Sequence, residues 1–162
     1  KKHLTFILSF TFMMIFSQIE NIKNGERITL RIHYGFLNAG YATLTANQVN
    51  YRNAPHYRVT GIGKSTGAVR AFFKVDDVYE SYINIATGLP SHYVRNVSEG
   101  SYKRHFETDF NHDNQTLVLT NKLDKTSKNF KTLKGIQDMI SSFYYLRSLD
   151  NSKFNHLLRQ QV

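Results

Sequence analysis

Arg27-Ile28-Thr29-Leu30-Arg31-Ile32-His33-Tyr34 alternates polar with apolar or aromatic side chains without a break. In an extended chain successive side chains point to opposite faces, so the apolar ones share one face and the polar ones share the other. This pattern is typical of an antiparallel strand with one face on a hydrophobic core and one face in water. We therefore predict a strand over these residues.

The same period of two continues downstream to about Thr120, broken at short intervals by turn residues. Gly35 and Asn38-Ala39-Gly40 provide backbone freedom for a bend or turn before 41–46, and Gly61 and Gly63 mark a bend or the close approach of another backbone. Helical spacing is rare in this region. The sequence therefore predicts a mainly β protein with a curved antiparallel sheet, either a half-barrel or a sandwich.

One amphipathic helix is predicted near 136–147. Apolar residues recur there at spacings of three and four, from Ile136 to Leu146, with polar residues between them. Asp138 in the first turn and Arg147 in the last turn suit the helix dipole. Because the apolar stripe must pack against another element, we expect it to cover the apolar face of the sheet.

Residues 1–17 have the layout of a secretory signal peptide. Lys1 and Lys2 precede an uncharged, apolar stretch over 4–16, and the chain becomes polar from Ser17. Such a stretch makes about 20 Å of helix, which is short for the roughly 30 Å hydrocarbon core of a bilayer. We expect cleavage after Ser17 and no stable transmembrane span afterwards; the alternative is a buried N-terminal helix.

The remaining chain, 18–162, has the length of a single domain, and its composition excludes several classes of protein. The absence of cysteine excludes a disulfide framework and thiolate metal sites. The whole chain has a net charge of +9, which falls to +7 without Lys1 and Lys2, and this positive charge favours acidic partners. For an exported protein these are lipid headgroups, envelope glycans and acidic proteins, so we expect no nucleic-acid partner.

Six segments occur in a distinctive order and spacing between about Gly25 and Leu149. They are 32–40 (IHYGFLNAG), 63–67 (GKSTG), 73–82 (FKVDDVYESY), 89–90 (LP), 99–102 (EGSY) and 137–147 (QDMISSFYYLR). Together they resemble an uncharacterised family of exported bacterial proteins, domain of unknown function 3108. The resemblance implies an exported, mostly antiparallel β domain of Gram-negative envelopes, including Bacteroidetes-like ones, in the periplasm or at the outer membrane. It carries over no catalytic residue.

Members of that family continue past the helix with further strands, whereas residues 157–162 look unlike that continuation. We therefore expect a single β-rich domain over 18–162 that is truncated at its C-terminus. Loss of the last strands would leave an apolar face or a strand edge open.

No motif predicts catalysis. Gly61-Ile62-Gly63-Lys64-Ser65 lacks the earlier glycine of a phosphate loop, because Arg58 occupies that position, and no serine lies in a nucleophile elbow. The histidines after residue 17 lack the spacing of a helical metal pair. Asp76, Asp77 and Glu80 suit either acid/base chemistry or, as we favour, cross-strand ion pairing. We expect no catalytic residue, no metal site and no cofactor.

Lysine recurs at every third position before the predicted helix. Such a run is typical of a solvated hairpin or loop. The functional alternative is an edge that faces anions, for phospholipid, lipopolysaccharide or an acidic partner. The anion-facing candidates are Lys122, Lys125, Lys128, Lys131 and Lys134.

Aromatic residues occur along every predicted strand. They either line a cavity on the concave face of a curved sheet or fill a core that contains no tryptophan. We hypothesise a non-catalytic envelope protein that binds a lipid-like or acylated ligand, or a lipoprotein, on that face. The alternatives are a structural module that binds another envelope protein and an envelope glycan hydrolase. The candidates for lining the ligand are Tyr34, Phe36, Tyr41, Phe72, Phe73, Tyr79 and Tyr82.

Overall fold

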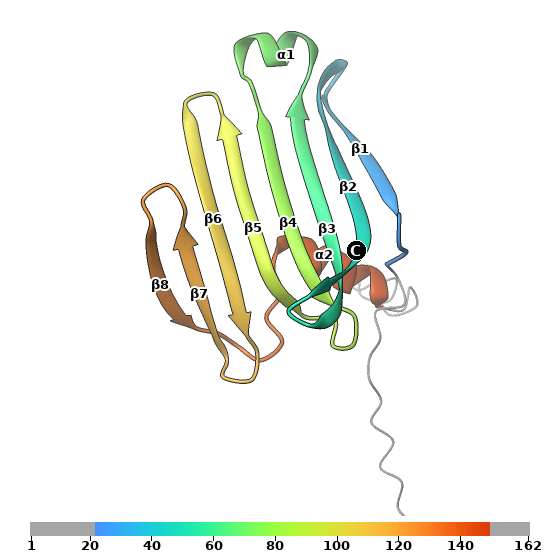
Figure 1. Cartoon of the computed structure of the whole chain (residues 1–162). Coiled ribbons are helices and arrows are strands. Elements are labelled where there is room, and N and C mark those ends of the chain that lie inside the picture. Colours follow the sequence, from blue (N-terminus) through green and yellow to red (C-terminus); the bar gives the residue numbers. More distant parts are fainter. Residues whose placement is uncertain (1–21, 150–162) are drawn as a thin grey trace, which may run out of the picture.

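The computed structural model describes residues 22–149, so the predicted signal peptide and the C-terminal segment 150–162 lie outside the described residues. Eight strands and two helices occur in this range (Figure 1). The elements are β1 (Arg27–Tyr34), β2 (Leu37–Tyr51), β3 (Ala54–Ser65), α1 (Gly67–Phe72), β4 (Asp76–Asn84), β5 (Pro90–Glu99), β6 (Tyr102–Asn111), β7 (Thr116–Asn121), β8 (Thr126–Lys131) and α2 (Met139–Ser148).

All eight strands form one antiparallel sheet in the order β1 to β8, so every strand pairs with its neighbours along the chain. β1 and β8 are the two edges of the sheet, and the sheet is open between them (Figure 1). The prediction of a mainly β protein with an antiparallel sheet and an amphipathic helix near 136–147 is confirmed. Of the two forms expected, the structure has a single open sheet and not a sandwich of two sheets.

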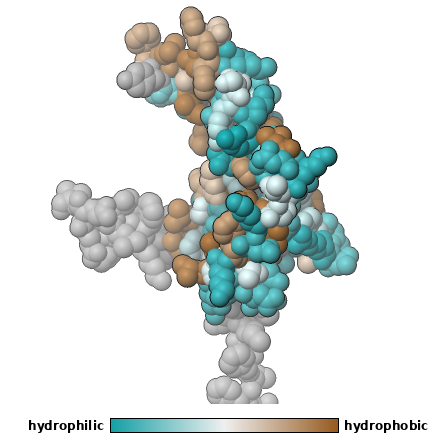
Figure 2. All heavy atoms as spheres, turned by 90° about the vertical axis from the view of Figure 1, so that its left-hand side faces the viewer, coloured by the Kyte–Doolittle hydropathy of each residue, from teal (hydrophilic) through white to brown (hydrophobic). Residues whose placement is uncertain are grey.

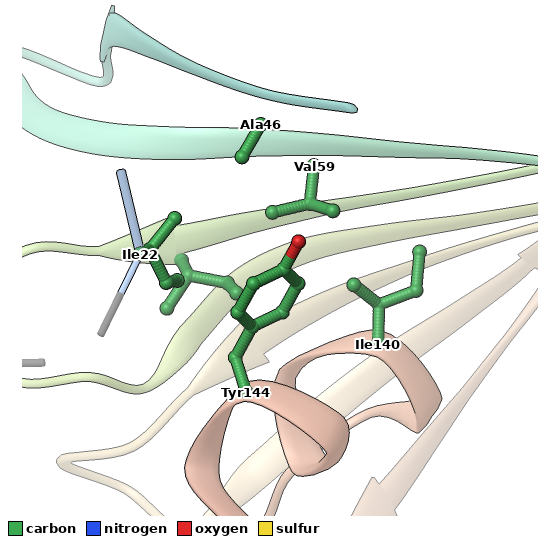
Figure 3. Packing of buried hydrophobic residues seen from close by; sticks show 6 residues of the cluster. Ile22, Ala46, Val59, Ile140 and Tyr144 are labelled. Atoms are coloured by element: carbon green, nitrogen blue, oxygen red, sulfur yellow. The ribbon is translucent and has the colours of Figure 1, made fainter. Parts of the chain in front are cut away.

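α2 packs on one face of the sheet, which we call the inner face. Ile140 and Tyr144 point from α2 toward the sheet and meet Ala46 of β2 and Val59 of β3 (Figure 3). Ile83 of β4 completes the contact from the sheet side. These five residues are all buried. The apolar stripe of the helix therefore covers the apolar face of the sheet, as its spacing predicts.

α2 begins at Met139, three residues later than the apolar spacing suggests, because Asp138 caps it. The Asp138 carboxylate accepts hydrogen bonds from the backbone N–H groups of Ile140 and Ser141, each at 2.8 Å. The Ser141 hydroxyl accepts from the Asp138 N–H at 2.9 Å, which completes a capping box. The Ser81 hydroxyl of β4 donates to the same carboxylate at 2.6 Å. The cap thus joins the start of the helix to the middle of the sheet.

The buried cap makes stability depend on pH. Burial raises the pKa of Asp138 above its ordinary value of 3.8, although the hydrogen bonds from Ser81, Ser141 and Ile140 oppose the shift. The folded chain therefore binds this proton more tightly than the unfolded chain. Lowering the pH from about 7 to about 4 should raise the free energy of unfolding of the wild type relative to Asp138→Asn, which cannot titrate. Urea unfolding of both chains at each pH measures this, and a constant or shrinking difference would contradict it.

The opposite, outer face of the sheet is polar, and its side chains pair with one another. Arg58 of β3 forms an ion pair with Glu80 of β4. Asp109 of β6 accepts a hydrogen bond from Arg52 and lies 2.8 Å from Nδ1 of His92. The polar residues of the strands thus form a network of ion pairs and hydrogen bonds on the outer face, as expected for the face of a sheet that contacts solvent. Within residues 22–149, no helix has the length and apolar character needed to cross a membrane.

Candidate functional site

The inner face holds a hollow of about 260 Å³ beside α1. α1 lies at the end of the sheet that α2 does not reach (Figure 1). Most of its lining is apolar side chain or bare backbone. Val69 of α1 and Val75 line it from the segment between β3 and β4, and Ile32 of β1 lines it from the edge of the sheet. The other lining residues are Ala39, Gly40, Gly63, Lys64, Ser65 and Asp77.

Small residues on two neighbouring strands make this space. Gly40 pairs with Ser65 and Gly63 pairs with Asp77 in the sheet register, so the floor of the hollow carries little side chain. A Cβ at Gly40 would overlap the carbonyl oxygen of Lys64, which shows how closely the backbone of β3 approaches there. A Cβ at Gly63 would meet no closer atom than Asp77 Cβ at 3.7 Å. The hollow is therefore open above Gly63.

Polar groups at the rim of the hollow are occupied by structural hydrogen bonds. The Ser65 hydroxyl accepts from the Val75 N–H at 2.9 Å, and buried Asp77 accepts from the Ser98 N–H at 2.9 Å. Neither side chain has the exposure expected of an acid, base or nucleophile that must meet a substrate. The arrangement suits contact with an apolar group better than chemistry on a polar one.

Arg70 fixes α1 over the hollow. Its guanidinium donates to both carboxylate oxygens of Asp76 at 3.0 Å and to the Val75 carbonyl at 3.1 Å. The hydrogen bonds from Arg70 hold the pKa of Asp76 below its usual value, with Lys74 adding to the effect. The Thr66 N–H donates to the Ala39 carbonyl at 3.0 Å and ties the start of α1 to β2.

The hollow continues into an exposed apolar strip on β1. Leu30 and Ile32 pair with Ala42 and Gly40 and so point to the inner face, where each is about half exposed. The alternation that predicted a strand is present, but this part of the apolar face has no covering element among residues 22–149. An apolar ligand in the hollow would thus find further apolar contact along β1.

A second hollow, of about 360 Å³, lies on β6, β7 and β8. Phe106, Leu119 and Phe130 form its apolar floor, and Lys128 and Asp124 lie at its side. These aromatic and aliphatic residues also point to the inner face. Tyr93 packs against the core on that face, and it pairs with Thr108, which in turn pairs with Leu119. Phe106 is two residues from Thr108 on the same strand and therefore points the same way. The remaining lining residues are Asn121 and Thr126.

The seven aromatic candidates do not gather on one surface. Tyr79 lies on the inner face, packed against the core, whereas Tyr41 and Tyr82 lie on the outer face, on the side of Thr43 and Glu80. Phe36 lies in the β1–β2 turn, Phe72 ends α1 and Phe73 follows it, all exposed. The side chain of Tyr34 lies outside the described part of the structure. None of the six described candidates lines the 260 Å³ hollow, which is aliphatic.

The five lysines are spread over both faces of the β7–β8 hairpin and the segment that follows it. Lys128 lies on the inner face opposite Leu119, and Lys131 lies on the outer face opposite Thr116. Lys122 pairs with Glu107 at 3.2 Å. Lys125 is in the turn and Lys134 follows β8. The hairpin is exposed, as the lysine pattern suggests, and the run does not form one continuous row.

The carboxylates of 76–80 do not share a site. Asp76 pairs with Arg70 and Glu80 pairs with Arg58, while Asp77 lies on the other face. Among residues 22–149 no group of three or more histidine, aspartate or glutamate side chains is arranged to hold a metal ion.

Sequence reasoning missed the residues that line the hollow because they are small. Val69 and Val75 lie outside any clear alternation, and glycine and alanine at 39, 40 and 63 signal only a turn or a close approach. The available signal was the position of Gly40 and Gly63 on the inner face of two neighbouring strands, beyond the residues that α2 covers.

Comparisons with known proteins assign a family and no activity. Neither the curated proteins nor the solved structures contain a match to this chain. The family model of DUF3108, described as "Protein of unknown function", matches residues 29–157, which is most of the chain. The chain therefore belongs to the DUF3108 family, as the six ordered segments suggest.

Proposed function

We propose that this protein binds the apolar part of a lipid-like or acylated ligand, without catalysis, in the hollow beside α1. The observation that carries the proposal is the aliphatic hollow of about 260 Å³ that opens onto half-exposed Leu30 and Ile32. Contiguous apolar surface of this kind is costly in water and commonly marks a binding site. Ligand pockets are concave and mainly apolar, with few polar groups, which matches this lining.

The size of the hollow limits what it accepts. Pockets for whole drug-sized ligands measure about 300–1,000 Å³. A hollow of about 260 Å³ therefore suits one acyl chain or a similar moiety, with the rest of the molecule outside.

We also propose that this binding takes place outside the cytoplasm, in the periplasm or at the outer membrane. The support is the order of residues 1–17, where two lysines precede an apolar stretch and then a polar boundary. Fractionation of cells that express the full chain, with N-terminal sequencing of the product, tests this. Recovery from the cytoplasm with the first residues intact would contradict it.

Filling the hollow is expected to weaken ligand binding at least about tenfold. Gly63→Leu places an isobutyl group above the floor, where only Asp77 Cβ is near, and so removes apolar contact worth about 1.5–3 kcal/mol. The probe is cis-parinaric acid, a fluorescent fatty acid, titrated against the full chain. Saturable binding by the wild type that is weakened in the variant is the expected result.

Thr43→Leu is the matched control, because it adds a leucine to the neighbouring strand on the outer face. It should bind the probe like the wild type. Urea unfolding of each variant shows whether Gly63→Leu still folds, and Ile32→Asp, at the open side of the hollow, provides a second variant. Equal affinity of wild type, Gly63→Leu and Ile32→Asp would contradict the proposal.

A further inference from the structure

Three chain connections lie at one end of the sheet, which we call the α1 end. They join β1 to β2, β3 to β4 through α1, and β5 to β6 (Figure 1). The β7–β8 connection lies lower, because Asn121 pairs with Phe106 and the register continues to Gly61 in the middle of β3. Each of the three connections carries or adjoins an exposed large hydrophobic residue. These are Phe36, Phe72 with Phe73, and Tyr102. Figure 2 shows hydrophobic residues gathered at this upper end of the molecule.

The connections at the opposite end differ. The β2–β3, β4–β5 and β6–β7 connections comprise 52–53, 85–89 and 112–115, and none contains an exposed large hydrophobic residue. Phe36 and Phe72 at the α1 end are also the most exposed of the described large apolar side chains, with Phe36 fully exposed and Phe72 91% exposed. The connections at the two ends of the sheet therefore present different surfaces.

α1 leaves Phe72 and its two alanines exposed, while Val69 lines the hollow. None of its six residues is buried, although its sequence contains Ala68, Val69, Ala71 and Phe72. The helix is held by the Arg70 hydrogen bonds to Asp76 and the Val75 carbonyl and not by a hydrophobic contact of Phe72 with the sheet. Phe73 lies beside Gly100 of the β5–β6 turn and links two of the connections. Exposed aromatic residues of this kind suit the interface of a bilayer, where aromatic rings lie at the level of the headgroups.

The exposed charge around these aromatics is strongly positive. Within three residues of the three connections, four basic residues and no acidic residue are exposed. The same distance around the three opposite connections contains one exposed residue of each sign, Arg52 and Asp113. The basic residues at the α1 end are Lys64, Lys74, Lys103 and Arg104. Aromatic residues beside exposed basic ones complement the headgroup layer of an anionic bilayer.

We propose that the α1 end docks on an anionic lipid bilayer, with Phe36 and Phe72 inserted at the level of the headgroups. This inference rests on exposure and charge at the connections and does not require the hollow to bind a ligand. Because Val69 of α1 lines the hollow, docking would place the opening close to the lipid surface. Peripheral binding of this kind is reversible and depends on both the apolar and the basic residues.

The absence of tryptophan from the chain allows a local test. Phe36→Trp and Phe72→Trp each place the single tryptophan at the proposed contact in the full chain. Vesicles of phosphatidylethanolamine with about a quarter phosphatidylglycerol should shift the emission of each to the blue, and brominated lipid should quench it. Leu133→Trp is the matched control, because Leu133 is 81% exposed but follows β8 at the other end of the sheet. Its emission should not change.

The local readout separates this contact from any binding by residues 4–16, which every variant shares. In the Phe72→Trp background, Lys74→Gln and Lys103→Gln should each weaken vesicle binding about fivefold, while Lys134→Gln leaves it unchanged. Vesicles of phosphatidylcholine alone should bind more weakly.

Three results would overturn the proposal. One is emission from positions 36 and 72 that does not respond to vesicles. Another is an equal response from position 133. The third is a blue shift without vesicles that grows with protein concentration, which would identify a second copy of this chain as the occupant. Binding of parinaric acid is measured without vesicles. A protein that fails to bind parinaric acid can therefore still be tested for docking on vesicles, and one that fails to dock can still be tested for parinaric acid binding.

Discussion

Replacing Tyr144 by alanine is expected to lower the free energy of unfolding by about 3–5 kcal/mol. The Tyr144 ring is fully buried between α2 and the sheet, against Val59, Ile83 and Ala46 (Figure 3). Its removal loses the transfer free energy of an aromatic ring and leaves a cavity that the sheet backbone cannot close. Since a domain is stable by only about 5–15 kcal/mol, this one change should consume a large share of its stability. Urea unfolding followed by circular dichroism measures the loss.

Tyr144→Phe is the control for that experiment. The Tyr144 hydroxyl is buried without a hydrogen-bond partner among the described residues, so removing it sacrifices no hydrogen bond. The phenylalanine variant should unfold within about 1 kcal/mol of the wild type or be more stable. A large loss in this variant would show that the hydroxyl is bonded and that packing is not the main contribution of the residue.

Asp138→Ala is expected to lower the free energy of unfolding by about 2–4 kcal/mol. About 1 kcal/mol comes from the lost helix cap, and the rest comes from leaving the buried Ser81 hydroxyl without its acceptor. The effect combines helix and sheet because the same carboxylate serves the N–H groups of α2 and the hydroxyl of β4. Thermal and urea unfolding provide the measurement.

Ser81→Ala and the double variant Ser81→Ala with Asp138→Ala complete a cycle with Asp138→Ala. If the pair acts as a unit, the double variant should lose less than the sum of the two single losses. Strict additivity would show that Ser81 and Asp138 stabilise the protein separately and that the cap does not couple α2 to the sheet.

The strands with a wet face are predictable from sequence, because alternation alone determines which residues share a face. Ile28, Leu30 and Ile32 lie on one face in the structure, as their spacing predicts. Alternation does not tell which stretches of that face are covered, since this depends on the length and placement of α2. Leu30 and Ile32 are therefore exposed although their pattern is that of core residues.

The sequence does not predict where α2 starts or which aromatic residues share a face, and both differences have physical causes. Apolar spacing extends back to Ile136, but the Asp138 side chain binds the backbone N–H groups that follow it and so sets the start of the helix. Tyr79 and Tyr82 are three residues apart on one strand, which places them on opposite faces. The sequence marks both as aromatic strand residues, and assigning them to a cavity also requires the pairing register.

The neighbour-only strand order has a consequence during synthesis. Each hairpin can form as soon as its second strand leaves the ribosome, since no strand waits for a partner from a distant part of the chain. The helix that covers the inner face is different, because α2 starts at Met139 whereas the sheet residues that it covers lie between Leu44 and Tyr93. The apolar face of a nascent sheet therefore remains uncovered until the last described element is made, and this interval is when aggregation or capture by a chaperone competes most strongly with folding.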